Sequence, residues 1–280
     1  MTSQSGPTLS PASSHDERLE RQTPESARRL SRLASGLGAA LPPLSVVVTL
    51  LALWEGYVEA SGIDAVTLPA PTRILDAGFR NRDLLLDHGV VTLYEALVGL
   101  AVAIAVGLAF ALLVDSIGAA RRALYPLLVG SQTVPVVVIA PLLVIWFGFG
   151  LTPKVLVVAL YTFFPITVAF ASGLAATDKE ALILMYTLGA GRLQTLRLLR
   201  VPQALPYFFT GLRIAATYAV VGAVFAEWSG AREGLGIFVL LMKNSFRTDL
   251  VFAAIFVIAG LSLLLFAAVG ALEKAIVRWR

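Results

Sequence analysis

The chain contains no cysteine and little charge. The absence of Cys among its 280 residues excludes disulfides, thiolate metal ligands and thiol redox chemistry. The two histidines, His15 and His88, are too few and too far apart to form a metal site. Only 14% of the residues are charged, whereas soluble domains usually carry about 25%. Because 58% of the residues are hydrophobic, the composition predicts an integral membrane protein.

Further absences narrow the function. No G-x-x-x-x-G-K-[S/T] motif occurs, so the chain has no P-loop to hold the phosphates of ATP. The apolar stretches contain no histidine, cysteine or paired carboxylates, which disfavours a membrane-embedded enzyme. The formal net charge of +4 comes from arginines at segment ends, without the aromatic-rich patch of a nucleic-acid-binding surface. We therefore expect no catalytic residue, no metal, no nucleic acid partner and no cofactor bound by this chain.

Long apolar stretches alternate with polar segments along the chain. A helix needs about 20 mostly apolar residues to cross the hydrocarbon core, because its backbone polar groups must be satisfied internally. Six stretches qualify, over residues 41–60, 92–114, 123–147, 153–176, 207–228 and 250–271. Residues 1–38 are rich in Ser, Pro, Arg and Glu, and predict a disordered tail. The expected fold is all-α, with a six-helix transmembrane domain over residues 39–280.

The positions of the basic residues predict the topology, since cytoplasmic segments retain Lys and Arg. With the N-terminus inside, inner segments hold fourteen of the 22 Lys and Arg residues and outer loops hold seven. Both termini are therefore expected in the cytoplasm. The remaining residue, Arg213, lies near the inner end of the fifth span. We expect its side chain to extend to the membrane interface, the alternative being an ion pair with an acid on another helix.

The longest inner segment, at about 177–206, carries the sequence LGAGRLQTLRLLRVPQALP at residues 188–206. Its leucines recur near a helical period, at Leu188, Leu193, Leu196 and Leu199. The pattern predicts a short amphipathic helix parallel to the membrane, which Pro202 ends. Gly189 and Gly191 allow a tight reversal and a close approach by another backbone. Such a helix is either an interfacial segment or a docking element for a cytoplasmic partner.

The same segment resembles the cytoplasmic EAA loop of permease subunits from ABC importers. In that loop E-A-A-x-x-x-G is followed by nine residues and then by I-x-L-P. Aligned on Gly189, the I, L and P positions hold Leu199, Val201 and Pro202, and the E-A-A positions hold Ile183, Leu184 and Met185. The resemblance thus lacks the glutamate, for which Glu180, about one helical turn earlier, is a candidate replacement.

The resemblance extends over roughly residues 65–275. The stretches LPAPTRI, SQTVPVVVIAPLLVIWFGFG, YTFFPITVAFASGL and AEWSGAREGLG all resemble permeases of nitrate, sulfonate and taurine importers. The second and last of these stretches are most similar to permeases for hydroxymethylpyrimidine-type thiamine precursors, and less similar to those for riboflavin. The type I ABC importer permease fold, with six transmembrane helices, is what this resemblance implies.

The resemblance also implies the partners. Two permease subunits, as a homodimer, would form the pathway in a bacterial plasma membrane, and an extracytoplasmic binding protein would deliver the solute. Two cytoplasmic ATPase subunits would use ATP and dock on the loop. The residues implied in docking are Leu188, Gly189, Ala190, Gly191, Arg192, Leu193, Leu196 and Pro202. The alternative from another class is an ATP-independent secondary transporter, which usually buries ionisable residues at mid-membrane.

Polar residues within spans are candidates for the pathway. Gln132 and Thr133 interrupt the third span before Pro135, where they either line a kinked pore segment or bond to a neighbouring helix. Glu227, next to Trp228, is interpreted as an interface anchor, with gating or substrate contact as the alternative. An aromatic constriction or ordinary packing is the alternative for the segment of Phe163, Phe164 and Pro165. A re-entrant turn or a plain loop turn is the alternative for Gly234 and Gly236.

Overall fold

The computed structural model describes residues 42, 45–116, 123, 126 and 130–278. The described regular elements are all helices, and the chain divides into two units, residues 1–62 and 63–280. In the first unit, residues 45–61 are helical and overlap the first predicted span. The tail predicted over residues 1–38 lies outside the described residues.

In the second unit, four helices are long and apolar enough to cross a membrane. They are α4 (Arg82–Ser116), α7 (Leu151–Ala175), α10 (Val201–Glu227) and α12 (Thr248–Ile276). Each contains most of one predicted span, namely the second, fourth, fifth and sixth. Hydropathy therefore located these four correctly, although α4 begins ten residues before the predicted residue 92.

The third predicted span, 123–147, is broken. Residues 132–135 are not helical, and α6 (Val136–Phe147) begins only after Pro135. Proline offers no amide hydrogen and forces the preceding residue out of the helical region, which explains a break at this position. The expected kink is thus a complete interruption, and α6 has 12 residues, too few to cross the bilayer alone.

Two short helices lie in segments predicted as outer loops. The first, α3 (Pro71–Arg80), has proline in its first turn, where the missing amide hydrogen costs nothing. The second, α11 (Leu235–Asn244), is apolar but only 10 residues long. Its apolar stretch is shorter than a membrane span requires, so hydropathy alone predicts a loop here.

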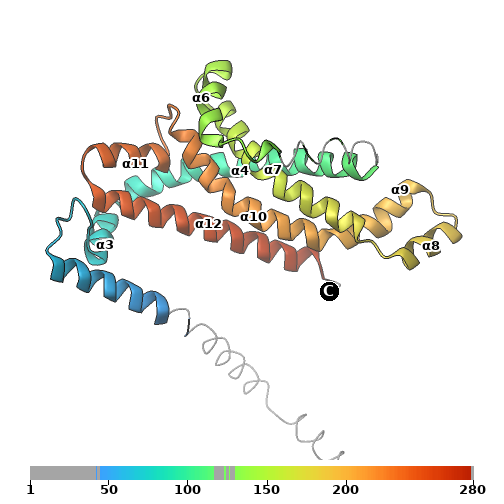
Figure 1. Cartoon of the computed structure of the whole chain (residues 1–280), viewed down its shortest axis with the longest axis horizontal. Helices are drawn as coiled ribbons and strands as arrows, with labels where there is room; N and C mark the ends of the chain where they lie inside the picture. Colours follow the sequence, from blue (N-terminus) through green and yellow to red (C-terminus); the bar gives the residue numbers. More distant parts are fainter. Residues whose placement is uncertain (1–41, 43–44, 117–122, 124–125, 127–129, 279–280) are drawn as a thin grey trace, which may run out of the picture. The chain divides into compact units, whose positions relative to one another are not determined.

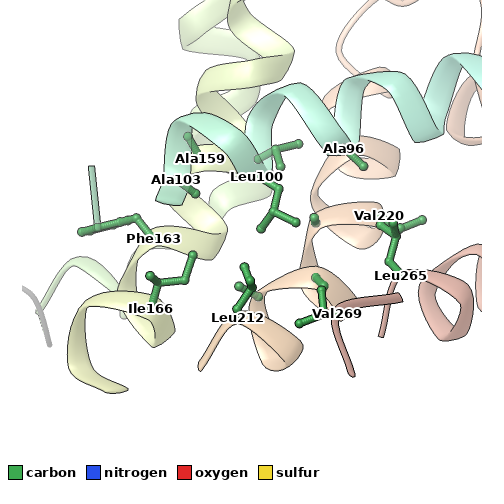
Figure 2. Close-up of a cluster of buried hydrophobic side chains, with 14 of the residues drawn as sticks. Ala96, Leu100, Ala103, Ala159, Phe163, Ile166, Leu212, Val220, Leu265 and Val269 are labelled. Atoms are coloured by element: carbon green, nitrogen blue, oxygen red, sulfur yellow. The ribbon is translucent and has the colours of Figure 1, made fainter. Parts of the chain in front are cut away.

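The core lies between α4, α7, α10 and α12, from which the buried side chains of Figure 2 come. Small residues allow the helices to approach closely. An added Cβ at Gly99 would lie 2.4 Å from Cβ of Val158, and one at Gly211 would lie 2.6 Å from the carbonyl oxygen of Pro165. Phe163 is part of this core, with its ring centroid 6.1 Å from that of Phe110.

The connecting segments gather at the two opposite ends of this helical bundle. Two short helices, α8 (Lys179–Thr187) and α9 (Arg192–Thr195), project from one end, beyond the end of α7 (Figure 1). At the other end, α11 and α3 lie beside the start of α4 (Figure 1). The two ends therefore carry separate candidate sites.

Candidate functional site

The projecting end is built around two helix caps. The side chain of Asp178 begins α8 by accepting a hydrogen bond of 3.0 Å from the amide of Glu180. The helix ends in a Schellman motif, in which Gly189 N donates to Tyr186 O at 3.0 Å and Ala190 N donates to Met185 O at 2.9 Å. These bonds satisfy carbonyls that the helix end would otherwise leave without partners.

Gly189 supplies the backbone conformation that this turn needs. Its φ is 77°, in the left-handed region that favours glycine. The tight reversal predicted here is confirmed. A Cβ added at Gly189 would meet no atom within 4 Å, so the close backbone approach also predicted is not made by the described part of this chain.

The helix after the turn differs from the prediction. Gly191 begins α9, and its amide donates to Oε1 of Gln194 at 3.0 Å. From there α9 continues through one π-helical turn, η1 (Leu196–Arg200), into α10. Pro202 lies in the first turn of α10, a position that tolerates proline, so the prediction that it ends a separate helix is wrong. Leu193, Leu196 and Leu199 therefore lie on an extension of a span and not on a separate helix, whereas Leu188 lies at the end of α8, before the turn.

Large apolar side chains remain exposed over α8, the turn and α9–η1. We call this the docking surface, after the role that the resemblance implies for this segment, and its members are Ile183, Leu184, Tyr186, Leu188, Leu193 and Leu198. Leu188 is 72% exposed and Leu193 is 74% exposed. Arg192 is also exposed, whereas Ala190, Leu196 and Pro202 are half-buried. Several large apolar side chains exposed in one segment are typical of a protein or membrane contact.

Arg200, one of the fourteen basic residues assigned to inner segments, anchors this projecting segment. Arg200 donates to both carboxylate oxygens of Asp115, at 2.8 and 2.7 Å, and to the carbonyl oxygen of Leu174 at 2.9 Å. Asp115 lies near the end of α4 and Leu174 near the end of α7. Because the partners are 85 and 26 residues away along the chain, no local sequence pattern indicated these bonds.

At the opposite end, Glu227 joins three segments. Its side chain is fully buried, and its Oε1 accepts a hydrogen bond of 2.6 Å from the hydroxyl of Thr92 on α4. Its Oε2 accepts from the amide of Gly236, and the amide of Leu235 donates to the Thr92 oxygen at 2.8 Å. The interpretation of Glu227 as an interface anchor is therefore wrong, because its carboxylate points into the protein. Its role in the pathway stays a prediction.

Gly234 brings the start of α11 against this carboxylate. Its φ is 121°, and an added Cβ would lie 2.2 Å from Cδ of Glu227. Its amide also donates to Nδ1 of His88 on α4 at 3.0 Å. The turn at residues 234–236 is thus held to α4 and α10. We call Thr92, Glu227 and residues 234–236 the outer latch, after the side of the membrane on which the distribution of Lys and Arg predicts them.

A charged cavity lies beside the outer latch. Lys154 on α7 forms an ion pair with Glu95 on α4, and both side chains are largely buried. The pair lies on the wall of a cavity of about 770 Å³, to which Tyr94, Phe149 and Arg232 also contribute. The cavity combines aromatic and charged groups at the end of the bundle opposite the docking surface.

Arg213 pairs with an acid on another helix. Its Nη2 donates to Glu273 on α12 at 2.6 Å, and its guanidinium lies 5.7 Å from the centre of the Phe266 ring. The alternative expected for this residue, an ion pair with an acid on another helix, is what the structure shows, and the extension to the membrane interface stays a prediction. A charge near the apolar core is retained because it is paired.

The remaining pathway candidates lie on the exposed break before α6. Gln132, Thr133 and Pro135 are all exposed, and the Thr133 hydroxyl donates to the carbonyl oxygen of Gly130 at 2.8 Å. The 12 residues of α6 rise about 18 Å, less than the roughly 30 Å of a hydrocarbon core. With residue 147 at the predicted end of the third span, the break is expected at membrane depth. Irregular backbone at that depth is tolerated only against protein or a water-filled cavity.

Comparisons with known sequences agree with this arrangement. Residues 99–278 match the family described as binding-protein-dependent transport system inner membrane component. The formylaminopyrimidine transport permease protein ThiX of Halalkalibacterium halodurans is 42% identical over 242 residues, which cover 86% of this chain and 96% of that protein. The riboflavin transport system permease protein RibX of Chloroflexus aurantiacus is 37% identical, covering 85% of this chain and 91% of the relative. The taurine transport system permease protein TauC of Escherichia coli is 30% identical, with coverages of 84% and 88%.

Solved structures show a similar fold. An amino acid ABC transporter crystallised with histidines has a TM-score of 0.56 at 17% identity, covering 72% of this chain and 96% of that one. The methionine ABC transporter MetNI, in an inward-facing form, also gives 0.56 at 19% identity, with coverages of 69% and 95%. At these identities the similarity concerns the fold alone.

Proposed function

Because the chain belongs to the inner-membrane components of binding-protein-dependent transport systems, we propose that two copies of it form the translocation pathway of an importer. The chain is an ABC importer permease in the plasma membrane, a transport component rather than an enzyme, and crosses the membrane several times. Membership implies an ATPase partner and a binding-protein partner. The sites where they act, their copy numbers and the solute form the rest of the proposal.

The ATPase docks on the docking surface. The observation that carries this assignment is the exposure of Leu188 and Leu193 on either side of the Gly189 turn, at the end of the bundle where α8 and α9 project. Apolar side chains on a preformed turn suit a groove on a partner protein, because little conformational freedom is lost on binding. Each permease copy offers one such surface, which gives two ATPase subunits per importer.

The ATP is held by the partner. This chain has no P-loop motif, so the phosphates of ATP are bound outside it. ATP-driven closure of the two ATPases then brings the two docking surfaces together, and the spans pass the movement to the pathway. The docking end, with both chain termini, is cytoplasmic in this proposal, as the distribution of Lys and Arg predicts.

The second copy covers the break before α6. Residues 132–135 expose non-helical backbone and polar side chains where the third span is expected to cross the membrane, and lipid would not tolerate them there. A pathway between two copies offers protein on one side and water on the other. Gln132 and Thr133 then contact the passing solute or its water. The cavity around Lys154 and Glu95, at the outer end, receives the solute from the binding protein.

The proposed solute is a pyrimidine precursor of thiamine. The relative named for formylaminopyrimidine is 42% identical, compared with 37% and 30% for the riboflavin and taurine relatives. Uptake assays with the complete importer, its binding protein and labelled formylaminopyrimidine, riboflavin or taurine test this choice. Saturable ATP-dependent uptake of the pyrimidine alone is expected, and uptake of riboflavin or taurine instead would replace it.

Docking is tested by affinity purification from the native membrane with a tag after Arg280. We expect a P-loop ATPase to co-purify with the parent chain, and to be lost with Leu193→Asp or Arg192→Glu. Arg278→Glu is the matched control, since Arg278 is exposed, lies outside the docking surface, and donates through Nε to the carbonyl oxygen of Ala275 on α12. Recovery of the chain alone, with solute transport in liposomes that lack ATP, would instead support a secondary transporter.

A further inference from the structure

We propose that Arg200 is the positioning residue that makes the docking surface, α4 and α7 move as one body. This inference rests on the proposed docking of the ATPase, and adds how the force leaves the docking surface. Arg200 is the last residue of η1 and directly precedes α10. Its guanidinium contacts two other helices at their ends, through Asp115 on α4 and the carbonyl of Leu174 on α7.

The joint at η1 would otherwise be a place to bend. A π-helical turn interrupts the regular hydrogen bonding of a helix, and such turns often lie at kinks. Pro202 and Pro206 follow within the next two turns, and each lacks an amide hydrogen. A push on the docking surface would be absorbed at this joint unless it were braced. Arg200 lies at the joint and braces it.

The geometry of the brace is specific to arginine. Two parallel bonds of 2.8 and 2.7 Å join its guanidinium to both oxygens of Asp115, which fixes the angle between the groups as well as their distance. A third bond reaches Leu174 O, a carbonyl at a helix end where intrahelical partners run out. A lysine ammonium, a single point donor, cannot reproduce this planar fork.

The position of Asp115 is favourable only because Arg200 pairs with it. A carboxylate that is largely buried is costly unless a cation pairs with it, so Asp115 would destabilise this part of α4 without Arg200. Its side chain is only 13% exposed, and the Arg200 side chain 25%. A partly buried charge pair is retained at a cost, which points to a role in fixing one arrangement of the helices.

Close packing behind the pair leaves little room for slippage. Ala204 on α10, one turn beyond Arg200, lies against α7, where a Cβ added at Gly173 would come within 2.9 Å of the Ala204 Cα. Leu174 and Ala204 share one apolar cluster with Ala111 of α4 and with Leu196 of η1. The amide of Asp178 also donates to Oε1 of Gln203 at 3.3 Å. The base of the docking surface is thus attached to both spans by polar and apolar contacts.

The test compares Arg200→Gln, Arg200→Lys and Asp115→Asn in the complete importer, reconstituted with its ATPase and binding protein. The ATPase should co-purify as with the parent chain, because the docking surface is unchanged. Solute transported per ATP hydrolysed should fall about tenfold for Arg200→Gln and Asp115→Asn, a usual size for coupling between sites. Arg200→Lys should fall in between. Arg197→Gln is the matched control, since Arg197 lies on the same turn and is exposed.

A distance measurement separates positioning from general stability. The cysteine-free chain accepts spin labels at Thr187→Cys, at the end of α8, and Leu113→Cys, near the end of α4, both at exposed positions. With Arg200 present, the distance between the labels should keep its mean when ATP and vanadate are added. In Arg200→Gln the distribution should broaden or shift, whereas Arg197→Gln should match the parent chain.

The outcomes separate the two proposals. Failure of the parent chain to bind any ATPase would overturn the docking proposal. Recovery of the ATPase, with transport per ATP and label distances in Arg200→Gln equal to those of Arg197→Gln, would overturn only the role of Arg200. If Arg200→Gln does not reach the membrane, the isosteric Asp115→Asn, which removes the same ion pair from the other side, decides in its place.

Discussion

Thr92 and Glu227 lie 135 residues apart in the chain, and their side chains share a buried hydrogen bond of 2.6 Å. The Thr92 oxygen simultaneously accepts a bond from the amide of Leu235. One hydroxyl therefore holds α4, the end of α10 and the start of α11 together. In a region with little water, neither the carboxylate nor the amide can find another partner cheaply.

Thr92→Val is expected to loosen the outer latch. Valine keeps the shape of threonine but leaves the Leu235 amide without a partner and Glu227 with one bond fewer. The free energy of unfolding should fall by about 1 to 3 kcal/mol, the usual cost of an unsatisfied buried group. Titration with a denaturing detergent measures this change. Thr210→Val is the control, since that residue is exposed and its hydroxyl donates to Pro206 O within the same helix, and equal losses for both variants would contradict the prediction.

Gly234→Ala should disrupt the same latch more severely. Alanine is strained at a φ of 121°, and its Cβ would overlap the Glu227 carboxylate. We expect a large loss of folded protein in the membrane fraction, measured by fluorescence-detected size-exclusion chromatography. Gly260→Ala on α12 is the matched control, because a Cβ there meets nothing within 4 Å and alanine favours helix. A Gly234→Ala variant as abundant as Gly260→Ala would show that the turn can rearrange.

The sequence predicted features that depend on local composition or on one residue's conformational freedom. Hydropathy located α4, α7, α10 and α12, because a span must be apolar along its whole length. The reversal at Gly189 followed from a glycine at the end of a periodic segment. The irregularity expected at Pro135 followed from proline chemistry, although the structure shows a complete break where a kinked span was predicted.

Features that depend on long-range packing could not be predicted from the sequence. Glu227 lies next to Trp228 at the end of an apolar run, a pattern that predicts a residue at the membrane interface. Its burial depends on contacts with α4 and α11, which no local pattern indicates. Proline is common both just after the end of a helix and in the first turn of a helix. The sequence around Pro202 does not distinguish these two positions. The pairing of Arg200 with Asp115 joins distant segments and leaves no periodic signature.

Gly189→Ala should weaken ATPase docking without unfolding the spans. The left-handed conformation at φ 77° costs alanine about 1 to 2 kcal/mol, so the turn between α8 and α9 would be less populated. Co-purified ATPase should decrease, while the thermal unfolding midpoint of the permease stays the same. Gly191→Ala is the control, since its φ of −71° suits any residue. Gly189→Glu should have a larger effect, because it also places a charge on the docking surface.

Lys154→Met should destabilise the outer end strongly. The ammonium group of Lys154 is paired with Glu95, whose side chain is only 5% exposed, so its removal strands a buried carboxylate. Removing one partner of a buried pair usually costs about 3 to 5 kcal/mol, whereas replacing both costs far less.

The double variant Lys154→Met with Glu95→Gln should therefore unfold closer to the parent chain than Lys154→Met alone, measured by the same detergent titration. The recovery identifies the stranded charge as the cause, because a general loss of packing would be additive in the two substitutions. Additive losses would instead mean that each side chain stabilises the cavity wall on its own. Uptake by the double variant then reports whether the charges, and not the fold they support, are needed for solute transport.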